Sequence, residues 1–247
     1  MGAEVCRAVS ADPGMQLVAA VDPVAAGAGL SSLGDIQEEL IVDSGSQALL
    51  EAGAEVAVDF TVASSALVNI KWCIDSGIHV VVGTTGLSSA VLEELGALAQ
   101  ARGTGLLVAP NFAIGAVLMM KFAETAAKWL PDAEIIELHH SAKLDSPSGT
   151  AIKTAEMIAG ARSQVPNLPD AETDARGAEK DGVRIHSVRL PGLVAHQEVI
   201  FGGLGQTLTI RHDSMDRTSF MPGVLLGIRE ISKHPGLTIG LEHLLSL

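Results

Sequence analysis

Residues 79–109 read HVVVGTTGLSSAVLEELGALAQARGTGLLVA. The largely apolar runs at 79–82 and 105–109 predict two buried strands, and the apolar spacing between them predicts a helix over 89–102. Strands that are apolar along their whole length are typical of a parallel sheet that is covered on both faces. A strand, a helix and a second strand in this order therefore predict one βαβ unit of such a sheet.

The same alternation of strands and helices continues toward the N-terminus. Strands are predicted at 17–21 and 56–60, and helices at 4–10, 47–51 and 64–75. With the first unit, they predict an α/β fold, a Rossmann-type doubly wound parallel sheet whose ligands bind outside the carboxyl ends of the strands. The residues at those ends are Asp22, Thr61, Gly83 to Thr85 and Asn111.

The pattern changes after Phe112, where longer helices and alternating strands begin. The sequence predicts a helix at 114–129, a strand at 133–140, a helix opening at Ser148, and a loop at 164–181 that is rich in Pro, Asp and Gly. Three alternating strands are predicted next, at 183–190, 194–201 and 207–213, with a turn at 202–205 that indicates a hairpin.

A further helix, predicted at 219–232, should pack back on the first half of the chain. The middle of the chain therefore reads as an α+β domain with an open sheet that is inserted into a nucleotide-type domain. We expect residues 113–213 to form this substrate-binding and oligomerisation domain. Residues 1–112 and 214–247 are expected to form the dinucleotide-binding domain.

The composition argues against several classes of partner. Sixteen Lys and Arg residues against 29 Asp and Glu residues give a net charge of −13, which argues against nucleic acids and anionic membranes. No apolar run approaches the length of a membrane span, and Met1 leads into a helix containing Glu4 instead of a signal peptide. Cys6 and Cys73 are too few for a disulfide framework and favour reduced thiols in the cytoplasm.

Residues 137–151, which read ELHHSAKLDSPSGTA, place groups that can give protons next to a helix start. His139 and His140 lie at the end of the predicted strand and should point to opposite faces. Lys143 follows in the loop. Ser148 is suited to cap the next helix, and Gly149 lets an anion approach the first backbone N–H groups. This stretch therefore indicates acid–base chemistry on a small anionic molecule.

Each of these features also has a structural interpretation. Paired histidines at a strand end are often one buried and one exposed side chain, and Ser-Gly-Thr is a common way to start a helix. A zinc site is a third interpretation, but His139 and His140 diverge on a strand and neither Cys belongs to a CxxC pair. No metal is expected.

Four separated motifs resemble those of a known family. They are the His-His, Lys and Ser-Gly-Thr run just described, VGTTG at 82–86, APNFAIG at 109–115, and RHDSMDRTSF at 211–220. In this order they resemble dihydrodipicolinate reductase (4-hydroxy-tetrahydrodipicolinate reductase), and the similarity extends over essentially the whole chain. Four motifs in one order are far more specific than any one of them.

The resemblance implies NAD(P)H-dependent reduction of 4-hydroxy-tetrahydrodipicolinate in diaminopimelate and lysine biosynthesis. The substrate is a six-membered nitrogen heterocycle with two carboxylates. His139 is then the expected proton donor and acceptor, because imidazole titrates near neutral pH. Lys143 is the expected second acid, which neutralises developing charge. His140, Gly149 and Thr150 are expected to bind the substrate.

The cofactor, NADH or NADPH, is expected in the first half of the chain. Asp22 follows a predicted strand, where an acidic residue accepts hydrogen bonds from ribose hydroxyls, although Asp22-Pro23 can also simply start a turn. The resemblance favours the ribose role, and the lack of an Arg cluster beside Asp22 favours NADH. The resemblance also implies that the nicotinamide is flanked by Gly83, Thr84, Thr85, Ala109, Pro110, Asn111 and Phe112.

The dinucleotide fingerprint needs a strand and a glycine-rich turn before its helix. This sequence opens directly in that helix, so Gly2 corresponds only to the last glycine of the family's loop. We expect the first strand and most of the phosphate-binding loop to belong upstream of Met1. Without that central strand, its two neighbours in the sheet should lack a partner.

Two other functions stay open on the residues alone. One is another two-domain NAD(P)-dependent dehydrogenase of amino or keto acids. The other is a non-catalytic dicarboxylate-binding relative with an incomplete cofactor site, although a mere sensor needs no proton donor. A positive mean hydropathy without a membrane span predicts self-association through the open sheet, and the resemblance implies a homotetramer.

Overall fold

The computed structural model describes residues 1–34, 36, 38–164 and 174–245. It divides into two compact units, one made of Met1–Phe112 with Phe220–Leu247 and the other of Ala113–Ser219. The expected domain boundaries lie at 112 and 214, whereas the second compact unit extends to Ser219. Its last strand runs through Ser214, and the Ser219 hydroxyl donates to the Ser214 hydroxyl over 3.2 Å.

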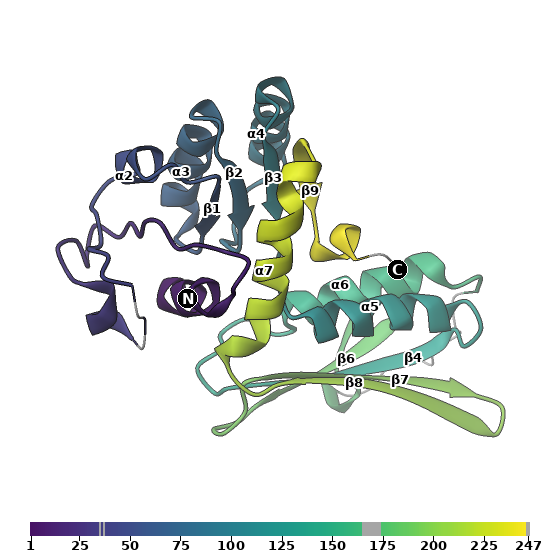
Figure 1. The fold of residues 1–247 in the computed structure, drawn as a ribbon. Coiled ribbons are helices and arrows are strands. Elements are labelled where there is room, and N and C mark those ends of the chain that lie inside the picture. The colour runs from purple at the N-terminus through teal and green to yellow at the C-terminus, as the bar shows by residue number, and fades with distance from the viewer. Residues whose placement is uncertain (35, 37, 165–173, 246–247) are drawn as a thin grey trace. The chain divides into compact units, whose positions relative to one another are not determined.

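The first unit is built on a parallel sheet of four strands in the order β1-β2-β3-β9 (Figure 1). Its elements are α1 (Gly2–Ala11), η1 (Leu30–Leu33), α2 (Gln47–Glu51), β1 (Val56–Asp59), α3 (Ala63–Asp75), β2 (His79–Val82), α4 (Ser89–Arg102), β3 (Gly105–Val108), η3 (Arg217–Phe220), α7 (Met221–Glu230), η4 (Ile231–Lys233), β9 (Gly236–Ile239) and η5 (Leu241–Leu244), of which η3 crosses the boundary between the units. The predicted strands and helices between residues 47 and 109 are confirmed to within one residue at each end.

Alternate residues of the central strands pack against different helices. Val80 and Val82 belong to one core cluster with residues of α3 and α4. Val81 and Leu107 lie on the other side, where a Cβ at Gly227 of α7 would come within 3.3 and 2.8 Å of their side chains. Helices therefore cover both faces, which confirms the predicted doubly wound sheet and explains why β2 and β3 are largely apolar.

The predicted strand at 17–21 is wrong. Val21 makes only an isolated bridge with Asp43, and the hydrogen bonds there are Asp22 N to Asp43 O and Asp43 N to Ala20 O, both 2.9 Å. A strand needs a continuous ladder with a neighbour, and among the described residues this segment has none. β1, in turn, is the outer strand of its sheet.

The C-terminal part of the first unit also differs from the prediction. The helix expected at 219–232 consists of η3, α7 and η4 in succession. Strand β9, which pairs in parallel with β3, was not predicted. It reads GLTI, and its threonine interrupts the kind of apolar run that marks β2 and β3 in the sequence.

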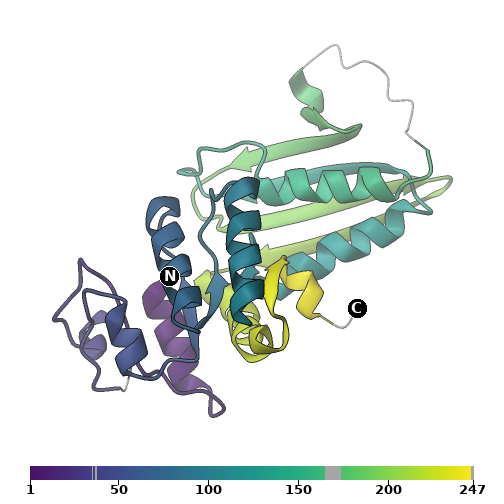
Figure 2. The ribbon, with the colours of Figure 1, turned by 90° about the horizontal axis from the view of Figure 1, so that it is seen from above.

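The second unit is a mixed sheet of five strands with two helices on one face, as Figures 1 and 2 show. The strand order is β5-β6-β4-β7-β8, and only β4 and β6 are parallel. This confirms an α+β unit. Its elements are α5 (Ile114–Ala127), β4 (Asp132–His139), α6 (Gly149–Ala161), η2 (Asp174–Arg176), β5 (Ala178–Lys180), β6 (Val183–Arg189), β7 (Ala195–Gly203) and β8 (Gln206–Ser214).

The loop predicted at 164–181 is only partly described, because residues 165–173 lie outside the described residues. The described remainder contains η2 and β5, which were not predicted. The predicted hairpin is confirmed: β7 and β8 pair antiparallel as far as Gly203 and Gln206, so the turn is Leu204-Gly205.

The described residues contain no disulfide bond, no helix that could span a membrane and no cluster of metal ligands. Cys6 and Cys73 are free, and burial raises the pKa of the Cys73 thiol to about 12. No described helix is long and apolar enough to cross a membrane. Among the same residues, no three His, Cys, Asp or Glu side chains come together as a metal site would require.

Candidate active site

Strand β4 directs two of its last polar side chains to the helix-covered face of the sheet. Side chains alternate along a strand, so Glu137 and His139 share a face with buried Ile135. The Glu137 side chain is 0% exposed and that of His139 is 14% exposed. His140 was expected to end this strand, but it follows the strand end and is exposed.

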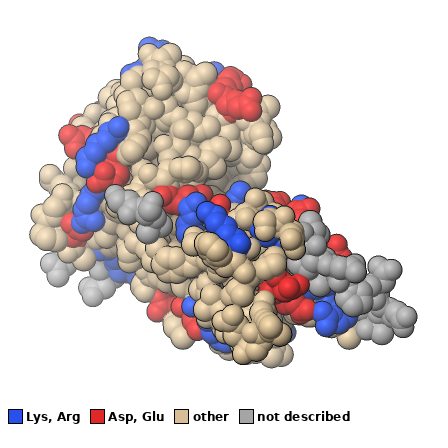
Figure 3. Space-filling view, turned by 90° about the vertical axis from the view of Figure 1, so that its right-hand side faces the viewer, with Lys and Arg blue, Asp and Glu red and all other residues tan. Residues whose placement is uncertain are grey.

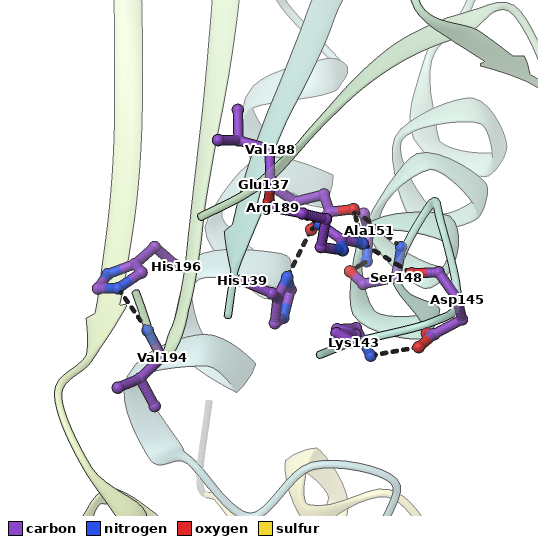
Figure 4. A network of polar contacts seen from close by, with 10 residues as sticks. All are labelled: Glu137, His139, Lys143, Asp145, Ser148, Ala151, Val188, Arg189, Val194 and His196. Atoms are coloured by element: carbon purple, nitrogen blue, oxygen red, sulfur yellow. Dashed lines mark hydrogen bonds and ion pairs between the residues drawn. The ribbon is translucent and has the colours of Figure 1, made fainter. Parts of the chain in front are cut away.

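The buried carboxylate of Glu137 contacts Arg189, His139 and Ser148. Arg189 of β6 binds it in a bidentate manner, with both guanidinium nitrogens 2.8 Å from the two carboxylate oxygens. His139 Nδ1 lies 2.5 Å from Oε2, and the Ser148 N–H donates to Oε1 over 3.2 Å. Figure 4 shows Glu137 and Arg189 between His139 and the start of α6.

These partners decide the charge of Glu137. Burial on its own would raise the pKa of this carboxyl, but hydrogen bonds from His139, Arg189 and Ser187 outweigh burial and lower the pKa to about 2. Glu137 is therefore ionised at neutral pH and can only accept hydrogen bonds. It follows that His139 Nδ1 carries the hydrogen of the contact between them.

Arg189 also holds the loop that contains Lys143. Its Nη2 donates to the Asp145 carbonyl over 2.7 Å and its Nη1 to the Val188 carbonyl over 2.8 Å. Asp145 in turn pairs with Lys143 Nζ over 2.8 Å, and this hydrogen bond lowers the pKa of Asp145. The Lys143 side chain is 23% exposed. The loop thus joins a partly exposed ammonium to the same buried pair.

The start of α6 has the features of an anion site. Ser148 is buried, and its hydroxyl caps the helix by accepting the Ala151 N–H over 3.3 Å, as predicted. A Cβ placed on Gly149 would meet nothing within 4 Å. Packing therefore does not require glycine here, and the backbone is open to a ligand. Thr150 accepts a hydrogen bond at its carbonyl from Thr154, over 2.7 Å.

Candidate cofactor residues lie at the carboxyl ends of β2 and β3, which are neighbours in the sheet of the first unit. Thr85, Pro110 and Asn111 are exposed or partly exposed there, as a cofactor site requires. Ala109 and Phe112 are each only 2% exposed, so their side chains belong to the core. A cofactor would meet these two residues through the backbone.

Two of the expected cofactor residues, Gly83 and Thr84, also have a structural task. The Thr84 hydroxyl donates to Asp59 over 2.7 Å and accepts the Thr61 N–H over 2.8 Å, so it is already occupied. A Cβ at Gly83 would come within 2.0 Å of the Phe60 ring, so glycine makes room for this ring. Buried Asp59 thereby fixes the ends of β1 and β2 relative to each other.

Asp22 and Gly2 are both exposed, which fits a role at the cofactor. One carboxylate oxygen of Asp22 accepts the Val24 N–H over 2.8 Å, so the residue does form a turn. Its exposed carboxylate is compatible with both interpretations of this residue. Gly2 opens α1, and a Cβ there would meet nothing within 4 Å.

Glu137 and Arg189 are the site residues that sequence reasoning missed. A signal for Glu137 exists, because it stands two positions before His139 and therefore on the same face of the strand. Arg189 lies far away in the sequence, and only the register of β4 with β6, which pairs His139 with Arg189, places it at the site.

The surface charge is mixed on the face drawn in Figure 3. Blue Lys and Arg side chains lie next to red Asp and Glu side chains, and no broad basic area appears on that face. Ion pairs within single units include Lys180 with Asp181 and Arg102 with Asp75. A face of this kind offers no extended site for a polyanion.

Two family models match the chain. The model described as "Dihydrodipicolinate reductase, N-terminus" matches residues 1–112, and the model described as "Dihydrodipicolinate reductase, C-terminus" matches residues 115–245. A protein of Nocardia farcinica named 4-hydroxy-tetrahydrodipicolinate reductase is 54% identical over 100% of this chain and 95% of its own. One of Mycolicibacterium smegmatis with the same name is 57% identical over 81% of this chain and 83% of its own.

Solved structures give the same picture. A dipicolinate-bound dihydrodipicolinate reductase from Paenisporosarcina sp. TG-14 is 44% identical to this chain. It superposes with a TM-score of 0.85 and covers 98% of this chain and 94% of its own. An amine dehydrogenase from Mycobacterium smegmatis, at 15% identity and a TM-score of 0.65 over 96% and 92% of the two chains, shows a likeness of fold alone.

Proposed function

We propose that this chain, which belongs to the dihydrodipicolinate reductase family, reduces 4-hydroxy-tetrahydrodipicolinate with a nicotinamide cofactor in the synthesis of diaminopimelate and lysine. In the balanced reaction NAD(P)H, a proton and 4-hydroxy-tetrahydrodipicolinate give tetrahydrodipicolinate, NAD(P)⁺ and water. The cofactor supplies a hydride when it is bound. The residues of the chain must supply the proton and hold the two carboxylates of the ring.

His139 is the proton donor in this proposal. Its ring is partly exposed, and the hydrogen on Nδ1 is engaged by Glu137. The proton that the ring can transfer is therefore the one that Nε2 carries in the imidazolium form. Lys143 is the second acid. Its ammonium is held in the adjacent loop and offsets the negative charge that develops in the ring.

The start of α6 holds a substrate carboxylate. Backbone N–H groups in the first turn of a helix, together with the helix dipole, favour an anion. Gly149 and Thr150 form this turn, and the space beside Gly149 is open. Exposed His140 is a further contact for the substrate. The dipicolinate in the related solved structure, itself a ring with two carboxylates, agrees with a site for a dianion.

One observation carries the proposal: a proton-donating imidazole and a helix start are tied to the same buried carboxylate. A non-catalytic dicarboxylate-binding protein has no need for a proton-donating imidazole. An assay tests it by following the nicotinamide absorbance after 4-hydroxy-tetrahydrodipicolinate is generated enzymatically. Oxidation of NADH or NADPH that depends on this substrate supports the proposal. Cofactor oxidation with amino or keto acids alone would favour a different dehydrogenase.

We further propose that NADH is preferred. Exposed Asp22 can accept hydrogen bonds from both ribose hydroxyls, and its negative charge disfavours a 2′-phosphate. Gly2, Thr85 and Asn111 would hold other parts of the cofactor. Steady-state kinetics with each cofactor should give a higher kcat/KM for NADH than for NADPH. The free thiols of Cys6 and Cys73 support a cytoplasmic location.

Gly149→Ala should separate binding from folding. Alanine fits the space at this position and favours a helix more than glycine does, so the unfolding temperature should not fall. The added methyl group should obstruct the carboxylate and raise KM for the substrate by about tenfold or more, since each tenfold step corresponds to about 1.4 kcal/mol. Thermal denaturation and steady-state kinetics measure both quantities. An unchanged KM would place the carboxylate elsewhere.

The protein should be a homotetramer that associates through the second unit. Within that unit, α5 and α6 cover one face of the sheet (Figure 1), and the other face presents partly exposed apolar side chains such as Ile136, Leu138 and Ile200. Such a face is stabilised by a partner. Light scattering at micromolar concentration should report four chains, and a monomer would contradict the proposal.

A further inference from the structure

The two halves of the candidate site meet at one side chain. Oε2 of Glu137 contacts His139, and Oε1 accepts the N–H of Ser148 at the start of α6. Arg189 binds both oxygens and also the carbonyl of Asp145 in the loop of Lys143. The proton donor, the helix start and the ammonium are thus all held by one buried carboxylate and its guanidinium partner.

We propose that Glu137 is a positioning residue that fixes the tautomer of His139 and ties this ring to the anion-binding start of α6, an inference that rests on the function proposed above. Glu137 itself is completely buried and acts through His139 and not on the substrate. Its carboxylate has no hydrogen to give, so the Nδ1–H form of the imidazole is the only neutral form that can bond to it.

The tautomer decides where the transferable proton resides. In the charged ring both nitrogens carry a hydrogen, and Nδ1–H stays bonded to Glu137. When the ring gives up its proton, the proton leaves from Nε2 and the neutral Nδ1–H ring remains. The same nitrogen then regains a proton from solvent for the next turnover. Without the Glu137 carboxylate the charged ring can lose the proton of either nitrogen. Only the proton on Nε2 is the one that the ring transfers in this proposal.

Charged groups come to this ring from three parts of the unit. β4 contributes Glu137, β6 contributes Arg189, and the loop after β4 contributes Lys143 and Asp145. The neighbour of His139 on β7 is Ala195, which does not titrate. Glutamine in place of Glu137 removes the negative charge but leaves the positive charge of Arg189. The protonated ring is then disfavoured, and the alkaline limb of the pH–kcat profile moves to lower pH.

The kinetic experiment compares Glu137→Gln with a matched control on the same strand. Glu134 also pairs with a histidine, His186, over 2.7 Å, but on the opposite face of the sheet. We expect E137Q to lower kcat by about tenfold or more and to move the alkaline limb, because an oriented general acid is worth about two to four orders of magnitude. E134Q should change neither. Equal pH profiles for E137Q and the parent would overturn the inference.

A double variant shows whether Glu137 acts through His139. If it does, E137Q adds nothing to the loss of kcat already caused by H139Q, whereas two independent effects multiply. E137D keeps the charge at a shorter reach and should return the alkaline limb toward that of the parent. Multiplying losses, or E137D behaving as E137Q does, would make Glu137 a merely structural residue.

A spectroscopic measurement tests the inference without any turnover. In the parent protein labelled with ¹⁵N-histidine, the signals missing from H139Q identify His139. At a pH where the ring is neutral, they should show hydrogen on Nδ1, although free histidine prefers Nε2. Hydrogen on Nε2 would overturn the inference, even if the reductase activity is present. A parent with the Nδ1–H ring but no activity would instead contradict the proposed function.

Discussion

Replacing His139 by Gln should lower kcat by about two to four orders of magnitude and change the affinity for the substrate only severalfold. The amide of glutamine can still donate to Glu137, so the strand end and the start of α6 should keep their places. It cannot release a proton near neutral pH. The loss therefore falls on the chemical step, which steady-state kinetics at saturating cofactor will measure.

A second histidine provides the control for this experiment. His186 on β6 also bonds to a glutamate of β4, but on the face of the sheet that α5 and α6 leave open. His186→Gln should therefore keep the parental kcat. A kcat of H139Q within severalfold of the parent would make His139 structural. A large rise in KM at constant kcat would give His139 the binding role that we assign to His140.

The parallel sheet of the first unit could be predicted because its strands carry their signal locally. β2 has three valines after His79, β3 reads GLLV, and a helix with a clear start and end joins them. Segment 17–21 has the same apolar character and is nevertheless not a strand. A segment becomes a strand only when another strand pairs with it, and the composition of the segment does not show whether such a partner is present.

The candidate site divides in the same way. His139, Lys143 and Ser148 stand within a few positions of one another, so a single loop brings them together and the sequence shows it. Arg189 joins them only through the parallel register of β4 and β6. In the sequence, Glu137 is one more polar residue near two histidines. Its burial could not be predicted, because it depends on the pairing with Arg189.

Replacing Arg189 by Met should destabilise the protein by about 3–5 kcal/mol at pH 7, the cost of leaving a buried charge without its partner. Methionine retains much of the apolar length of the side chain, so lost packing is a minor part of this cost. Glu137→Met combined with Arg189→Met removes both charges and should recover most of the stability. Lys180→Met, which breaks an exposed pair with Asp181, is the control and should change little. Urea unfolding gives the free energies.

The same variant gives a pH dependence with a definite sign. In the parent the pKa of Glu137 is lowered from 4.5 to about 2, so its ionised form adds on the order of 3 kcal/mol of stability above pH 4.5, and this is lost as the pH falls toward 2. Arg189→Met removes one of the hydrogen bonds that lower the pKa of Glu137. The unpaired carboxylate then becomes neutral by binding a proton. Because this becomes easier as the pH falls, the stability difference between parent and variant should be largest at pH 7 and clearly smaller at pH 3. A difference that is equal at both pH values would mean that Arg189 stabilises the fold by packing and not by pairing with Glu137.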